Sequence, residues 1–97
     1  MSKYVRKKVK RQHGIIKGIL PLLERISKIE GVKKVVPAAI FPAASSTGKP
    51  RITLQRETVS GFKLLAHSSG AVQEIFLVVT KEKRLDVKQA LENYIIN

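Results

Sequence analysis

GFKLLAHSSGAVQEIFLVVT, Gly61–Thr80, is the stretch that decides the fold. Its first part alternates apolar and polar residues, with Phe62 and Leu64 on one side and Lys63 on the other. This period of two is typical of a β-strand that buries one face. The residues of Ser68–Gly70 favour a turn, and an apolar run follows them. The stretch therefore predicts a β-hairpin.

The second strand of this hairpin is apolar on both faces in its later half, Ile75–Val79. Such a strand needs cover on both sides. It can lie at the centre of a sheet in a monomer, or it can be covered by a second copy of the chain. Both interpretations remain open, and the second predicts a homodimer.

Two further strands are predicted upstream of the hairpin. Arg51–Glu57 alternates, with Ile52 on its apolar side. Val32–Pro42 is rich in β-branched residues but contains Pro37 and Pro42. Proline cannot donate a hydrogen bond to a neighbouring strand, so this segment is expected at an edge of the sheet.

Helical patterns flank the strands on both sides. The spacing of apolar residues predicts a helix over Ile15–Glu30, in which Pro21 either causes a kink or opens the regular helix after a looser turn. A second helix is predicted within Leu85–Ile96. Asp86 with Gln89 three residues later resembles a capping box at its start.

The order helix, four strands, helix predicts an α+β two-layer sandwich with mainly antiparallel strands. Residues 13–97 would form a single domain, preceded by a flexible basic N-terminal arm at residues 1–12. Arg51–Glu57 and the strand that starts at Gly61 would form another hairpin. Pairing Gln55 with Lys63 in it would place five polar residues on the exposed face of the sheet: Arg51, Thr53, Gln55, Lys63 and His67.

Charge indicates a polyanionic partner. Nineteen Lys and Arg stand against seven Asp and Glu, for a formal charge of +12. A strongly basic small domain is typical of nucleic-acid binding, although charge also serves solubility. We expect a nucleic-acid partner, RNA favoured, held mainly by its backbone. Aromatic residues are only 5% of the chain, which favours structured RNA or a duplex over a stacking platform. The expected contacts are Lys3, Arg6, Lys7, Lys8, Lys10, Arg11, Lys33, Lys34, Lys49, Arg51 and Lys63.

Several other function classes find little support. Cysteine is absent, which excludes thiolate chemistry, and two histidines without a nearby aspartate do not make a catalytic triad. Lys49 is followed by Pro50, so Ser46–Pro50 is not a phosphate-binding P-loop. No apolar run approaches the roughly 20 residues of a membrane helix. We expect a non-catalytic cytoplasmic protein without a cofactor or a membrane partner.

Metal binding is an alternative function. Imidazole and carboxylate groups suit zinc and similar transition metals, and the candidates are His13, His67 and Glu74. The two histidines show no common ligand spacing, and the surroundings are cationic. The competing interpretation places His13-Gly14 as the junction between arm and helix, where glycine permits a sharp change of direction.

Two segments carry a resemblance to a known family. "QHGIIKGILPLLERI" (Gln12–Ile26), followed by "GFKLLAHSSGAVQEIFLVV", resembles a small prokaryotic family of unknown function whose members are catalogued as predicted metal-binding proteins. The shared pattern runs from His13 to Thr80. The resemblance implies one compact domain and a metal site to which His13 and Glu74 are the matching candidates.

Overall fold

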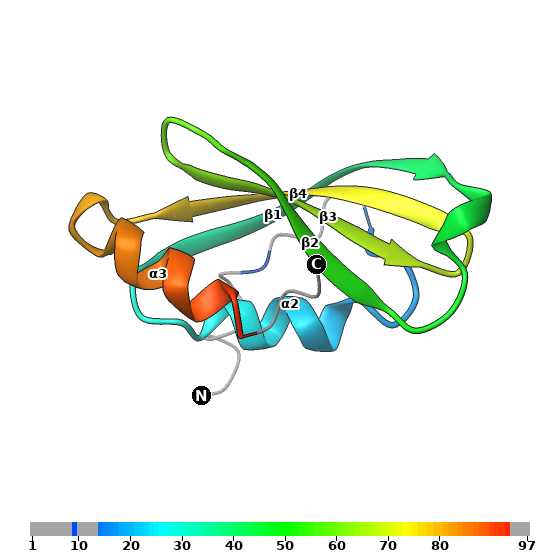
Figure 1. Ribbon diagram of the computed structural model, residues 1–97, viewed down its shortest axis with the longest axis horizontal. Helices are drawn as coiled ribbons and strands as arrows, with labels where there is room; N and C mark the ends of the chain where they lie inside the picture. The colour runs from blue at the N-terminus through cyan, green and yellow to red at the C-terminus, as the bar shows by residue number, and fades with distance from the viewer. Residues whose placement is uncertain (1–8, 10–13, 94–97) are drawn as a thin grey trace.

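The structure is a computed structural model that describes Val9 and residues 14–93 (Figure 1). Its four-stranded sheet forms one layer, and both helices lie against the same side of it. This arrangement confirms the predicted α+β sandwich. The elements in chain order are α2 (Leu20–Ser27), β1 (Val32–Pro42), the 3-10 turn η1 (Ala44–Ser46), β2 (Arg51–Glu57), β3 (Gly61–Ser68), β4 (Ala71–Val79), the 3-10 turn η2 (Lys81–Lys83) and α3 (Arg84–Leu91).

The strands are antiparallel, and their order across the sheet is β1-β4-β3-β2. The two-sided apolar strand β4 therefore lies at a central position. That position accounts for its pattern without a second subunit, while the homodimer stays a prediction. β1, which contains Pro37 and Pro42, lies at an edge as expected.

The first helix is shorter than its apolar pattern predicts. α2 starts at Leu20, so residues 15–19 lie outside it, and the prediction of one helix over Ile15–Glu30 is wrong. Pro21 is the second residue of the helix, where its missing N–H costs nothing, so it opens the helix and does not kink it. Gly31 follows with φ of 101°, in the left-handed region that favours glycine.

The last helix starts earlier than its sequence pattern indicates. α3 begins at Arg84, and no side chain caps its first turn. Asp86 lies inside that turn, so the predicted capping box with Gln89 is wrong. The favourable effect of a carboxylate near a helix N-terminus remains, because Asp86 still lies in the first turn.

The β2–β3 register agrees with the predicted one except at one bulge. Arg51 pairs with His67, which places both on the exposed face as predicted. A register shift after Leu54 then places Arg56 opposite Lys63, so the predicted pairing of Gln55 with Lys63 is wrong. Such a bulge adds one residue to an edge strand and increases its twist. The β3–β4 turn has two central residues, both with positive φ, as the type I′ hairpin requires.

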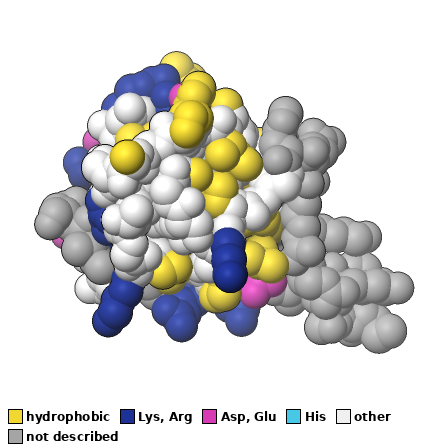
Figure 2. Space-filling view, turned by 90° about the vertical axis from the view of Figure 1, so that its right-hand side faces the viewer, with side chains coloured by type: hydrophobic (Ala, Val, Ile, Leu, Met, Phe, Trp, Pro, Cys, Tyr) yellow, Lys and Arg dark blue, Asp and Glu magenta, His cyan; other side chains and the backbone are white. Residues whose placement is uncertain are grey.

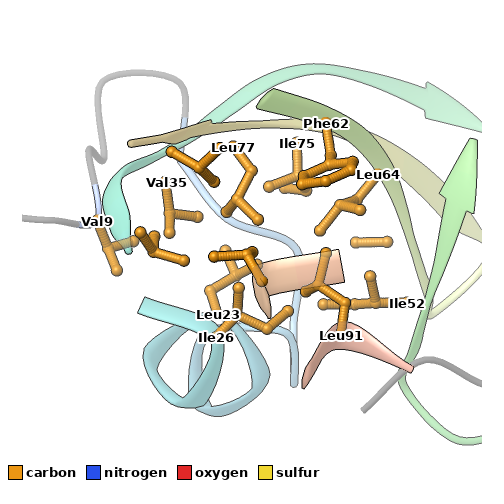
Figure 3. Packing of buried hydrophobic residues seen from close by; sticks show 14 of the residues in the cluster. Val9, Leu23, Ile26, Val35, Ile52, Phe62, Leu64, Ile75, Leu77 and Leu91 are labelled. Carbon is orange, nitrogen blue, oxygen red and sulfur yellow. The ribbon is translucent and has the colours of Figure 1, made fainter. Parts of the chain in front are cut away.

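The hydrophobic core lies between the sheet and the two helices (Figure 3). Leu23 and Ile26 from α2 and Leu91 from α3 meet the buried face of the strands there. Val9 joins this core and forms an isolated parallel bridge with Val35 on β1. Val9 belongs to the predicted arm at residues 1–12, and it is buried because the free edge of β1 accepts this apolar residue. The other arm residues lie outside the described part of the chain.

The side chain of Gln73 on β4 forms hydrogen bonds with the segment before α2. Its side chain is fully buried, and its Nε2 donates to the carbonyl of Gly14 at 2.8 Å and of Ala38 at 3.2 Å. Its Oε1 accepts from the N–H of Ile16 at 3.2 Å. One buried amide thus joins the chain before α2, the edge strand β1 and the central strand β4.

Among the described residues, no helix has the length and apolarity needed to cross a membrane.

Candidate nucleic-acid interface on the open face of the sheet

The sheet has a second face, turned away from the helices, which we call the open face (Figure 1). Residues paired across antiparallel strands lie on the same face, so the register assigns its members. They form four transverse rows: Phe41–Val72–His67–Arg51, Glu74–Leu65–Thr53, Val36–Phe76–Lys63–Arg56, and Lys34–Val78. Arg51, Thr53, Lys63 and His67 therefore lie on one face of the sheet, as predicted. Arg56 takes the position that was predicted for Gln55.

Lys63 lies near the middle of this face, and its charge is already paired. Its Nζ is 3.0 Å from a carboxylate oxygen of Glu74, and the two side chains are only 14% and 26% exposed. The same ammonium lies 5.7 Å from the centre of the Phe76 ring. Lys63 is therefore a weaker candidate for a phosphate contact than its sequence position suggested, because its positive charge is neutralised and covered.

Three other cations on the open face differ from Lys63. Within the described part of the chain, Lys34, Arg51 and Arg56 form no ion pair with a carboxylate. Other carboxylates are engaged close to α3. The ion pairs there join Lys83 to Glu30 and Asp86, and both Arg84 and Lys88 to Glu57.

His67 is held by two hydroxyl groups. Its Nε2 lies 3.1 Å from Oγ1 of Thr53, and its Nδ1 lies 3.4 Å from Oγ of the buried Ser46. Burial lowers the pKa of His67 below its usual 6.5, and the nearby charge of Arg51 lowers it further. The ring is therefore neutral at pH 7. It can accept a hydrogen bond through one nitrogen and donate through the other.

Of the three predicted metal ligands, the structure describes only His67 and Glu74. His67 and Glu74 share the open face, but they are not paired. Glu74 is opposite Leu65, which lies two residues before His67 on β3. Both are already engaged, His67 with hydroxyls and Glu74 with Lys63. Among residues 9 and 14–93, no group of three His, Cys, Asp or Glu side chains could hold a metal ion. His13 lies outside the described residues.

The remaining predicted contacts fall at the margins of the sheet or beyond the described residues. Lys33 is exposed at a register shift near the start of β1, and Lys49 is exposed in the loop before β2. The arm cations are outside the described residues: Lys3, Arg6, Lys7, Lys8, Lys10 and Arg11.

Sequence reasoning missed two aromatic members of the open face. Phe76 was included only in an apolar run, and Phe41 follows a register shift between Pro37 and Ile40 that interrupts the alternation of β1. The pairing of Phe41 with Val72, which itself pairs with His67, is what places Phe41 on this face. Only the order of the strands carries that information.

Comparison with known proteins gives one match. Neither the curated proteins nor the solved structures contain a match to this chain. A family model described as "Predicted metal-binding protein (DUF2103)" matches residues 4–94, which extends beyond the resembling segments at both ends. The match confirms the resemblance noted in the sequence, and the chain belongs to this family of predicted metal-binding proteins.

Proposed function

We propose that this protein is a non-catalytic nucleic-acid-binding module, RNA favoured, that contacts the phosphate backbone through its open face and its basic N-terminal residues. One observation carries the proposal. Lys34, Arg51 and Arg56 share the open face and have no carboxylate partner in the described part of the chain. Unpaired cations on one face attract phosphates, and the release of counterions adds to the affinity.

The spread of these cations favours a polymer over a small anion. Arg51 and Arg56 on β2 pair with His67 and Lys63, which are four residues apart on β3 and therefore about 13 Å apart along the strand. Lys34 lies on β1, at the opposite edge of the sheet. A single small anion does not reach all three groups, whereas successive phosphates of one chain do. The guanidinium groups also present paired donors that match phosphate oxygens.

Binding measurements on two charge-matched variants test the proposal. The first variant combines Arg51→Gln with Arg56→Gln on the open face. The control combines Arg25→Gln with Lys28→Gln, which are exposed in the last turn of α2 and just after it, in the opposite layer. Both variants lose the same formal charge. Fluorescence anisotropy with a labelled RNA, recorded over a series of salt concentrations, then compares them.

The open-face variant should bind more weakly, and the slope of log affinity against log salt should fall by about 1.4 to 1.8 for two lost phosphate contacts. The control should keep most of the wild-type slope. Equal losses in both variants would show that only net charge matters and would contradict the proposed interface.

The arm is better tested by exchanging its cations for glutamine than by deletion, because deletion of residues 1–11 would also remove Val9 from the core.

Zinc titration of the wild-type chain tests the alternative given by the family description. The metal function would require His13 and His67 to act together, and His67 would first have to leave its hydroxyl partners. Tight stoichiometric binding that is lost in both His13→Ala and His67→Ala would favour the metal function.

The predicted homodimer has its own test. A monomer mass at high concentration in light scattering would rule out the homodimer.

A further inference from the structure

We infer that the open face takes a single strand, with an unpaired base stacked on Phe41 and a neighbouring phosphate on Arg51. This inference rests on the proposed function and specifies its ligand. The two residues are the ends of one transverse row, Phe41–Val72–His67–Arg51, to which all four strands contribute. At about 4.8 Å between strands, the row is about 14 Å long. It therefore has room for a base at one end and a phosphate at the other.

Phe41 has the exposure that a stacking residue needs. Its side chain is 50% exposed, near the end of the edge strand β1. Figure 2 views this end of the molecule and shows exposed hydrophobic side chains with Lys and Arg side chains around them. The other phenylalanine of the open face, Phe76, is half-buried beside the Lys63 ammonium. Of these two rings, Phe41 is the one available to a base.

Several hydrogen bonds hold the chain next to Phe41 in place. The N–H of Ala43 donates to the carbonyl of Gly70 at 2.8 Å, and the N–H of Gly70 donates to the carbonyl of Ser46 at 3.3 Å. Ser46 also contacts the ring of His67 through its hydroxyl. The end of β1 is thus fixed to the β3–β4 turn. A backbone held in advance loses less freedom when a ligand binds, so more of the stacking energy contributes to affinity.

The middle of the row is suited to the apolar face of a sugar and not to a second phosphate. Val72 is apolar, and His67 is neutral with both ring nitrogens already engaged. A base in a duplex is stacked on its neighbours and cannot lie on a protein ring, whereas unpaired bases can. An exposed phenylalanine at one end of the row, with an arginine that has no carboxylate partner among the described residues at the other end, therefore favours a single strand. This inference differs from the expectation of structured RNA or a duplex, which rests on composition.

A tryptophan probe reports directly on stacking. The chain contains no tryptophan, so Phe41→Trp introduces a single reporter. Val59→Trp is the matched control, because Val59 is fully exposed at the β2–β3 turn, away from the row. The two ligands are a short oligouridylate and inorganic polyphosphate of similar charge. We expect oligouridylate to quench the fluorescence of the Phe41→Trp variant but not that of the Val59→Trp variant, and polyphosphate to quench neither.

Affinities complete the test. Phe41→Ala should weaken oligouridylate binding about 5- to 150-fold, in line with the stacking contribution of one base, and should leave polyphosphate binding unchanged. Ile40→Ala, which removes a neighbouring exposed side chain, should change neither affinity. Circular dichroism confirms that these exposed-site variants fold.

The outcomes separate the inference from the function on which it rests. If neither ligand binds the wild-type chain, the proposed function fails. If both ligands bind with equal affinity and the Phe41→Trp variant is not quenched, polyanion binding stands and the stacking inference is overturned. If Phe41→Ala instead dissociates a dimer and leaves oligouridylate affinity unchanged, a second copy of the chain covers Phe41, which also overturns the inference.

Discussion

Replacing Gln73 should weaken the whole fold, because its amide joins three segments that are distant in sequence. In Gln73→Leu the side chain keeps a similar size, but the hydrogen bonds to Gly14, Ile16 and Ala38 are lost. Each typical hydrogen bond contributes about 1 kcal/mol net, and an unsatisfied buried group costs more. Gly14 is exposed, so water can satisfy its carbonyl. We therefore expect the free energy of unfolding to fall by about 2 to 4 kcal/mol.

Gln73→Glu gives a sharper form of the same prediction. A carboxylate can still accept from the N–H of Ile16, but it cannot donate to the carbonyls of Gly14 and Ala38. Burial and these two carbonyls should raise the pKa of the new carboxyl in the folded state above its unfolded value of about 4.3. Its unfavourable effect is therefore smallest below that unfolded value, and stability is lost as the pH rises through the folded pKa.

Urea unfolding followed by circular dichroism at several pH values measures both effects. Gln89→Glu on the exposed side of α3 is the control, because it makes the same charge change without burial. Hydrogen exchange at the Ile16 amide should also become faster in Gln73→Leu. A Gln73→Leu protein within about 0.5 kcal/mol of wild type would refute the reasoning, since one hydrogen bond alone is worth more than that.

Two further predictions concern Gly61 and His67. A Cβ on Gly61 would lie 1.9 Å from the carbonyl oxygen of Leu77, so Gly61→Ala should force β3 and β4 apart and lower the free energy of unfolding by about 3 kcal/mol or more, measured by urea unfolding. The pKa of His67 is lowered in the folded chain by burial and then by Arg51, so the unfolded chain takes up a proton first and stability should fall as the pH drops below 6.5. His67→Gln should flatten this dependence below about pH 6.5, and an unchanged slope would assign it to other groups.

Local patterns in the sequence were sufficient to find the strands and the faces of β3, although not the starts of the two helices. The alternation of residues 61–67 assigned Phe62 and Leu64 to the core and Lys63 and His67 to the opposite face, as the structure confirms. A side chain's face follows from the period of two in any strand, whatever its neighbours are. For the same local reason, Gly31 marked the turn after the first helix, and Pro37 and Pro42 marked an edge strand.

Tertiary structure alone decided which residues on a face come together. The bulge that places Arg56, and not Gln55, opposite Lys63 depends on how β2 twists against β3. Val9 enters the core because β1 has a free edge. Phe41 and Arg51 share a row only because β1, β4, β3 and β2 lie in that order. Strand order is determined by long-range packing of the whole core, which no local period records. The sequence therefore determined the faces of the sheet and its basic character, and the fold decided the arrangement of the candidate site.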